Sequence, residues 1–229
     1  MTAPAGVVAD PATPVTIPTP RGEIAGLHRP VAGARWLYVL GHGAGAGMSH
    51  RFMVAIADAL ADRGVATLRW EQPAMTAGRR RPDPPAVVEV LARAACAFAR
   101  ELAPASRLCA GGKSMGGRMT SQAQARAPLP GIEALIFLGF PLHPAGAPGT
   151  ERARHLADVG LPLLFVSGTR DALATPALLG PVVAALPRAR LVALDDADHG
   201  LDVPKRAGFD PVARAADAVV AFLDELPPR

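Results

Sequence analysis

The sequence has few cysteines, few aromatic residues and no long apolar run. Only 2 of the 229 residues are cysteine, and Cys96 and Cys109 fall in a helical pattern and a buried-strand pattern, so no disulfide framework is predicted. No segment reaches the roughly 18 uninterrupted apolar residues of a membrane-spanning helix. The N-terminus has neither the basic start nor the apolar stretch of a signal peptide. We therefore predict a soluble, cytoplasmic protein with no membrane partner.

The sequence also lacks any strong excess of one charge. Lys and Arg number 24 against 20 Asp and Glu, and the basic residues are scattered except for the run at Arg79, Arg80 and Arg81. No nucleic-acid-binding motif accompanies this run, which we interpret as a solvated loop, with attraction of an anionic substrate as the alternative. The six histidines show neither i, i+4 pairs nor clustering with cysteine. We predict no metal, no cofactor and no nucleic-acid partner.

What is present is enough apolar sequence for one core. Half of the residues are apolar, and α/β chains of this length commonly fold as one domain. Residues 1–13 form an Ala- and Pro-rich stretch that we expect to be a flexible tail, followed by a single domain at 14–229. The 24 prolines and 23 glycines suit a fold with many tight turns.

Strand-like and helix-like segments alternate along the chain. This alternation predicts a mostly parallel sheet with helices on both faces, and the apolar runs LYVL, LIFL and LLFV are typical of strands buried on both sides. The connection at 139–160 has room for one short helix, so no large cap domain is expected. We expect strands at 15–18, 23–29, 36–40, 65–70, 107–111, 132–138, 163–166 and 191–194, and helices at 52–63, 86–102, 115–126, 151–159, 176–186 and 211–226.

The segment Gly112-Lys113-Ser114-Met115-Gly116 is the most informative part of the sequence. It is a G-x-S-x-G motif between a predicted strand and a predicted helix, where a strained turn would present the serine hydroxyl and the glycines would let strand and helix approach. A phosphate-binding loop would need glycine at 107, where Arg107 stands. The motif favours Ser114 as the nucleophile of an α/β-hydrolase fold.

The order of residues after the serine identifies the candidate base and acid. In an α/β-hydrolase the triad follows the order serine, acid, histidine, each after a strand. His199 follows the last predicted strand, and Asp171 follows the strand before it. Asp195, Asp196 and Asp198 are interpreted as shaping the turn that carries His199. We predict Ser114, Asp171 and His199 as the catalytic residues.

Two backbone N–H groups are needed to stabilise the oxyanion of the tetrahedral intermediate. One is predicted at Met115, directly after the nucleophile at a helix N-terminus. The other is predicted at Ala44 in the glycine-rich loop after strand 36–40, with Gly43 as the alternative. We interpret His42 as a packed residue that orients this loop, and His50 as either a helix cap or a residue at the mouth of the site.

Several blocks of the sequence resemble a known family. HGAGAGMSHRFM, GGKSMGGRM, LGFPLHPAG, FVSGTRD and DADHGL are similar to an uncharacterised α/β-hydrolase family close to the dienelactone hydrolases, over about residues 20–226. That group includes a testis-expressed vertebrate protein and a subunit of a nuclear histone-acetyltransferase complex. The resemblance implies the same triad positions and a GFPLHP segment (139–144) bordering the acyl pocket. Dienelactone hydrolases use a cysteine nucleophile, whereas this chain has Ser114.

These observations predict an enzyme that hydrolyses ester bonds. The expected reaction is cleavage of a small-molecule carboxylic ester or thioester through a Ser-His-Asp triad and an acyl-enzyme intermediate. Two alternatives remain, a non-catalytic interaction module on the same fold and a serine peptidase or acyltransferase. The natural substrate, its acyl-chain length, the choice among ester, thioester and amide, the oligomeric state, the pathway and the role of the arginine run stay open.

Overall fold

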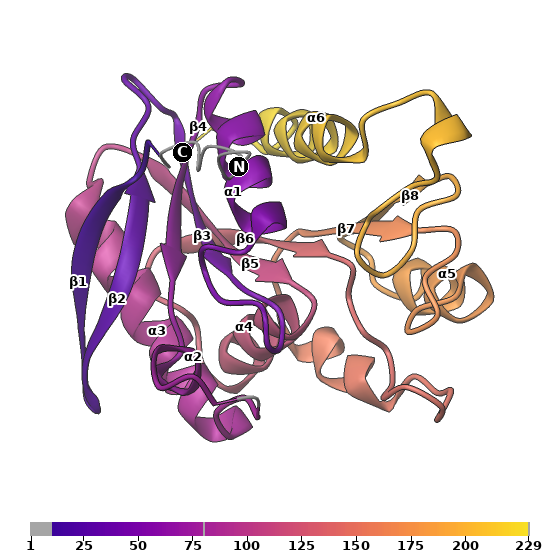
Figure 1. The fold of residues 1–229 in the computed structure, drawn as a ribbon, viewed down its shortest axis with the longest axis horizontal. Coiled ribbons are helices and arrows are strands. Elements are labelled where there is room, and N and C mark those ends of the chain that lie inside the picture. Colours follow the sequence, from indigo (N-terminus) through magenta and orange to yellow (C-terminus); the bar gives the residue numbers. More distant parts are fainter. Residues whose placement is uncertain (1–10, 80, 229) are drawn as a thin grey trace, which may run out of the picture.

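A single eight-stranded sheet forms the centre of the protein (Figure 1). The computed structural model describes residues 11–79 and 81–228. The strands lie in the order β1-β2-β4-β3-β5-β6-β7-β8; β2 is antiparallel to β1 and β4, and the remaining neighbours are parallel. The strands are β1 (Thr13–Thr19), β2 (Gly22–Arg29), β3 (Trp36–Gly41), β4 (Val65–Trp70), β5 (Arg107–Lys113), β6 (Ile132–Leu138), β7 (Leu163–Gly168) and β8 (Ala189–Leu194).

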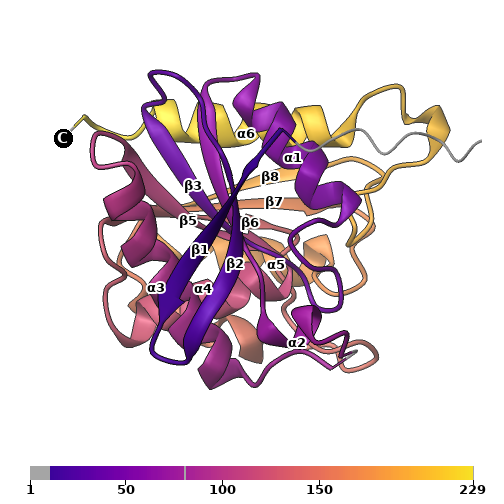
Figure 2. The same ribbon diagram turned by 60° about the vertical axis from the view of Figure 1, so that its left-hand side comes forward.

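Helices cover both faces of the sheet. α1 and α6 pack against one face, and α3, α4 and α5 cover the other (Figures 1 and 2). The helices are α1 (Arg51–Ala61), α2 (Pro73–Thr76), α3 (Pro85–Leu102), α4 (Met115–Arg126), α5 (Pro176–Ala184) and α6 (Pro211–Asp224), with 3₁₀ turns η1 (Glu151–Asp158) and η2 (Lys205–Ala207).

The central strands are mostly apolar because both of their faces are buried. All residues of β3, β4 and β7 are buried, and their side chains alternate between the two apolar layers. In β3, for example, Leu37 and Val39 join the layer under α3 and α4, whereas Tyr38 and Leu40 join the layer under α1 and α6. Each such aliphatic side chain contributes about 1.5–3 kcal/mol through burial.

The structure confirms the expected fold class and the expected order of strands and helices. It adds two short elements that the sequence pattern did not indicate, α2 and η2, which are too short for a hydrophobic period to reveal them. The segment at 151–158 is a 3₁₀ helix, and it is the sole helical element between β6 and β7, so no cap domain is inserted there. The expected tail at 1–13 lies outside the described residues except for 11–13, and β1 already begins at Thr13.

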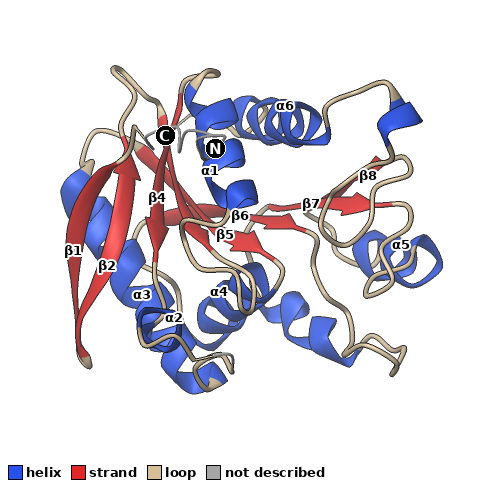
Figure 3. Cartoon of the chain, in the orientation of Figure 1, coloured by secondary structure: helices blue, strands red, loops and turns tan. Residues whose placement is uncertain are grey.

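The parallel strands place their carboxyl ends at one edge of the sheet. The loops that follow β3, β5, β7 and β8 therefore meet at this edge, where α/β proteins commonly bind ligands (Figure 3). These are the loops that carry the candidate site residues.

Among the described residues, no helix has both the length and the apolarity that crossing a bilayer requires.

Candidate active site

Ser114 lies at the junction of β5 and α4 with a strained backbone. Its φ is 49° and its ψ is −113°, a conformation that costs a non-glycine residue on the order of 1–3 kcal/mol. The two motif glycines make the turn possible, because a Cβ on Gly112 would lie 2.1 Å from the Gly41 oxygen and a Cβ on Gly116 would lie 2.4 Å from the same atom. The local sequence thus produces a sharp strand-to-helix turn that exposes the serine.

The tertiary fold brings the three predicted triad residues into one hydrogen-bonded row. Ser114 Oγ lies 2.8 Å from His199 Nε2. His199 Nδ1 lies 3.0 Å and 2.9 Å from the two carboxylate oxygens of Asp171. The three side chains come from the ends of β5, β7 and β8 and are separated by up to 85 positions in the sequence.

The surroundings of Asp171 determine which ring nitrogen of His199 carries the proton. Asp171 is fully buried and also accepts a hydrogen bond of 2.7 Å from the backbone N–H of Leu173. A carboxylate can only accept, so His199 Nδ1 donates to it and Nε2 is left as the acceptor for the Ser114 hydroxyl. The row can therefore take a proton from Ser114 and stabilise the resulting imidazolium.

The loop after β3 brings the predicted second oxyanion donor to the serine. Gly43 approaches so closely that a Cβ there would lie 3.7 Å from Ser114 Cβ, and Ala44 lines the same cavity as Ser114. Met115 is the first residue of α4, where backbone N–H groups have no partner within the helix and the helix dipole favours negative charge. Ala44 thus lines the cavity of Ser114, and Met115 follows the serine directly in the chain.

His42 and Glu71 hold this loop from behind. His42 is fully buried, with Nδ1 2.8 Å from the Gly43 oxygen and Nε2 2.8 Å from Glu71 Oε1. Burial raises the pKa of Glu71, but hydrogen bonding and charge at His42 and the backbone N–H groups of Met48 and Gln72 outweigh it, so the pKa is lowered. One carboxylate therefore anchors both His42 and Met48. His42 is a loop residue, in line with its interpretation from the sequence.

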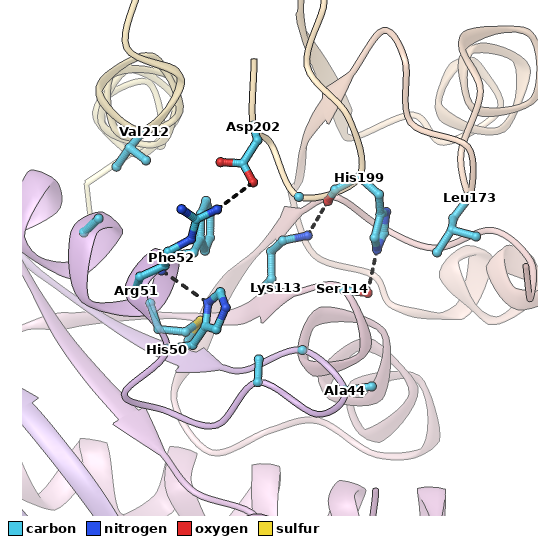
Figure 4. Close-up of a pocket in the computed structure, with 15 residues that line it drawn as sticks. Ala44, His50, Arg51, Phe52, Lys113, Ser114, Leu173, His199, Asp202 and Val212 are labelled. Carbon is cyan, nitrogen blue, oxygen red and sulfur yellow. Dashed lines mark hydrogen bonds and ion pairs between the residues drawn. The ribbon is translucent and has the colours of Figure 1, made fainter. Parts of the chain in front are cut away.

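A cavity of about 550 Å³ opens beside Ser114. It extends from the serine past Phe52 toward Val212 at the start of α6 (Figure 4). His50 lines it and also caps α1, accepting a hydrogen bond of 3.3 Å from the Phe52 N–H, so both interpretations of His50 hold. The lining residues are Gly43, Ala44, Ala46, His50, Arg51, Phe52, Met53, Ala55, Lys113, Ser114, Leu173, His199, Gly200, Asp202 and Val212.

Comparison of the whole sequence with protein-family models gives one assignment. Residues 34–224 match the model described as an alpha/beta hydrolase domain, a range that includes all three residues of the row. The chain belongs to this family. A search of curated proteins found no match to the chain.

Solved structures of other α/β-hydrolases share this fold. A dienelactone hydrolase from Anabaena variabilis has a TM-score of 0.76 and 18% identity, over 93% of this chain and 96% of its own. A serine hydrolase without a lid from Xanthomonas campestris has a TM-score of 0.73 and 18% identity, over 98% and 100%. An esterase domain from Rhodothermus marinus has a TM-score of 0.69 and 18% identity, over 92% and 97%. At these identities the likeness concerns the fold.

A second serine–histidine contact lies elsewhere in this α/β-hydrolase domain. Ser121 in α4 is 2.7 Å from His155 Nε2, and its hydroxyl donates a hydrogen bond of 2.8 Å to the Arg118 carbonyl. Since that proton is already used, His155 must donate to Ser121. Burial and the nearby Arg118 lower the pKa of His155 to about 4, which keeps it neutral. Ser121 itself is fully buried.

The structure also places side chains at the site that the sequence analysis did not select. Lys113 lies in the cavity wall beside Ser114, and Glu71 anchors the loop after β3. The signal for Lys113 was a charged residue directly after the uncharged stretch LCAGG of β5. Nothing in the sequence pairs Glu71 with His42, because 29 positions separate them and only the parallel pairing of β3 with β4 aligns the strands they follow.

The GFPLHP segment contacts the loops that carry His199 and Leu173. None of the lining residues of the 550 Å³ cavity belongs to 139–144. Instead, Gly139 lies against the backbone of His199, and the Leu142 N–H donates to the Leu173 carbonyl at 2.9 Å. The segment therefore contacts the site without lining this cavity, and its place at the acyl pocket stays a prediction. Within the described residues, no group of three or more His, Cys, Asp or Glu side chains is arranged to hold a metal ion.

Proposed function

We propose that this α/β-hydrolase domain is a serine hydrolase that cleaves a carboxylic ester or thioester through an acyl-enzyme intermediate. The observation that carries the proposal is the row from Ser114 Oγ to His199 to Asp171, with donor–acceptor distances of 2.8 and 2.9 Å. The strained backbone of Ser114 supports it, because a strained residue at the mouth of a cavity is typical of functional sites.

In the first half-reaction, His199 Nε2 accepts the proton of the Ser114 hydroxyl while Ser114 Oγ attacks the substrate carbonyl carbon. The carbonyl oxygen becomes an oxyanion that accepts hydrogen bonds from the backbone N–H groups of Met115 and Ala44. The bond to the leaving group then breaks, and the alcohol or thiol takes the proton from His199. Asp171 stabilises the imidazolium in between and is not itself protonated.

In the second half-reaction, water replaces the leaving group. His199 removes a proton from the water as its oxygen attacks the acyl carbon, and the same two N–H groups hold the second oxyanion. Collapse of this intermediate returns the proton to Ser114 Oγ and releases the carboxylic acid. His199 accepts and then releases every proton that moves, exchanging them with Ser114, the leaving group and water, so the scheme needs no cofactor.

The proposed family grouping, substrate class and location rest mainly on the sequence. The motifs GGKSMGGRM and GFPLHP support a grouping with the uncharacterised relatives of dienelactone hydrolases that include the testis-expressed protein and the nuclear subunit. A small-molecule acyl substrate is supported by the size of the cavity, about 550 Å³, within the range of small-molecule sites. The cytoplasmic location stays a prediction.

The test combines labelling by a fluorophosphonate probe with turnover of p-nitrophenyl acetate. Wild-type protein should do both, and Ser114→Ala should abolish labelling and lower kcat/KM by a factor of about 10⁵ to 10⁶. Wild type that neither labels nor turns over the ester, or Ser114→Ala that keeps both, would overturn the proposal.

The matched control is Ser121→Ala, which removes the other serine that contacts a histidine. Ser121 is buried, lies outside the cavity wall and has no free proton acceptor, so its loss should leave labelling and kcat/KM within twofold of wild type. If Ser121→Ala rather than Ser114→Ala removed the labelling, the nucleophile would have been assigned to the wrong pair.

A further inference from the structure

Lys113 is a buried cation directly beside the nucleophile. Its residue is 9% exposed, and its side chain runs along the cavity wall between Ser114 and Phe52, with Nζ 5.8 Å from the centre of the Phe52 ring (Figure 4). A methionine would fill the same length without the cost of desolvating an ammonium group. The contacts of the ammonium group should therefore explain why a charged residue occupies this position.

The ammonium group contacts the backbone of the candidate base. Lys113 Nζ donates a hydrogen bond of 2.5 Å to the carbonyl oxygen of His199. Among the described residues, no other group donates a hydrogen bond to the His199 carbonyl oxygen. It joins the end of β5, which is fixed between β3 and β6, to an irregular loop 86 positions further along the chain.

The loop that carries His199 has little regular structure of its own. Two of its non-glycine residues have positive φ, Asp196 at 57° and Leu201 at 65°. Bonds between Asp198 and Asp202 close a turn around His199, and the Asp196 N–H donates to Thr169, but these bonds hold the neighbours of His199 rather than His199 itself. A conformation of this kind persists only where surrounding contacts hold it.

Gly139 makes room for this contact. A Cβ at Gly139 would lie 3.0 Å from the His199 oxygen and 3.0 Å from Lys113 Nζ, so any side chain there would press against both partners. Burial lowers the pKa of Lys113 to about 8, and the nearby Asp171, Asp198 and Asp202 act in the opposite direction by favouring the charged form. The amine can donate to the carbonyl in either protonation state.

We propose that Lys113 is a positioning residue that fixes the backbone of His199, so that the imidazole stays between Ser114 and Asp171. This inference rests on the proposed serine-hydrolase function. It assigns the lysine of the G-K-S-M-G motif to holding the base through the His199 carbonyl, with no contact to the reacting atoms. Displacement of a catalytic group by about 1 Å can reduce the rate by a factor of about 100.

The first measurement compares Lys113→Met with wild type in p-nitrophenyl acetate hydrolysis and in the rate of fluorophosphonate labelling. We expect kcat and the labelling rate to fall about 10- to 100-fold, KM to stay within twofold and the melting temperature not to fall. A kcat within twofold of wild type would overturn the inference. A raised KM with unchanged kcat would also overturn it, because it would make Lys113 a substrate-binding residue.

The second measurement separates the hydrogen bond from the space that the side chain fills. The variant Lys113→Cys is alkylated with 2-bromoethylamine, which rebuilds a lysine-like side chain with its ammonium group. A second sample is alkylated with 1-bromopropane, which gives a side chain of the same length without a hydrogen-bond donor. Mass spectrometry verifies that each sample is fully modified. Cys96 and Cys109 are fully buried with raised pKa values, so they should not react. The aminoethyl form should recover most of the kcat and the propyl form should not. Equal recovery would reduce Lys113 to a packing role.

These outcomes are distinct from failure of the proposed function. If the enzyme is not a serine hydrolase, wild type and every Lys113 variant will lack labelling and turnover alike. If only the positioning role is wrong, wild type will be active and Lys113→Met will match it.

Discussion

Among the residues that the structure describes, two serine–histidine pairs have nearly equal distances but differ in the direction of their hydrogen bond. The distance is 2.8 Å between Ser114 and His199 and 2.7 Å between Ser121 and His155. In the first pair Asp171 accepts a hydrogen bond from Nδ1–H, so Nε2 is the acceptor for the serine hydroxyl. In the second pair the serine already donates to the Arg118 carbonyl, so the histidine donates. The distance between serine and histidine alone therefore does not identify a nucleophile.

The two pairs also differ in their backbone and surroundings. Ser114 has a φ of 49° at the start of a helix and borders a cavity, whereas Ser121 lies within α4 and is fully buried. Burial and the cationic neighbour Arg118 disfavour protonation of His155. His199 instead donates a hydrogen bond from Nδ1 to the Asp171 carboxylate. In each pair the further hydrogen-bond partner, Asp171 or the Arg118 carbonyl, sets the direction of the serine–histidine hydrogen bond and hence what the serine can do.

Replacing Asp171 should do most to remove the difference between the two serine–histidine pairs. Asp171→Asn keeps the shape but can donate to His199 Nδ1, which moves the ring proton to Nε2 and gives the first pair the same direction as the second. We expect kcat/KM to fall by a factor of about 10³ to 10⁴ with little change in KM. Steady-state kinetics and the fluorophosphonate labelling rate measure this, and activity within tenfold of wild type would remove Asp171 from its proposed role.

The second largest effect is expected from a change in the backbone beside Ser114. Gly112→Ala places a methyl group about 2.1 Å from the Gly41 oxygen in a conformation with φ of +136°. The strands must separate, and we expect the free energy of unfolding to fall by about 3 kcal/mol or more. Denaturant unfolding monitored by circular dichroism provides the measurement.

The control for this variant is Gly208→Ala. Gly208 also has positive φ, at +72°, but a Cβ there meets nothing within 4 Å. It should cost only the left-handed backbone penalty of about 1 to 2 kcal/mol. Equal losses in the two variants would mean that the close approach of β5 to β3 is not what requires glycine in the motif.

The smallest expected effect is the contribution of His155 to the pH dependence of the free energy of unfolding. Because the pKa of His155 in the folded protein, about 4, lies below the ordinary histidine value of 6.5, the unfolded chain binds a proton between these pH values that the folded protein does not. His155 therefore contributes stability above pH 6.5 that is lost as the pH falls toward 4. The imidazole is only partly buried, so we expect a loss of about 1 kcal/mol between pH 7 and pH 5.

This loss is measured by comparing wild type with His155→Gln, which keeps a donor for Ser121 but does not titrate. Urea unfolding at pH 7 and pH 5 should show the larger decrease for wild type. The same decrease in both proteins would assign the pH dependence to other groups.

Much of the fold was predictable because hydrophobic patterns report burial directly. The runs LYVL, LIFL and LLFV correctly indicated strands covered on both faces, and the helices at 86–102 and 115–126 occur as predicted. The elements that were missed, α2 and η2, span one turn or less and leave no periodic signal. The place of GFPLHP at the acyl pocket stays a prediction, because a sequence motif does not show which of its residues face a cavity.

The sequence by itself determined the candidate nucleophile and its local geometry. Glycines at 112 and 116 can be read directly, and the steric demand of a strand-to-helix turn is local. Only the tertiary structure decided which histidine nitrogen faces Ser114, that Glu71 supports the loop after β3, and that Lys113 reaches the His199 carbonyl. Those contacts depend on sheet order and loop conformation, which place residues side by side that are far apart in the chain.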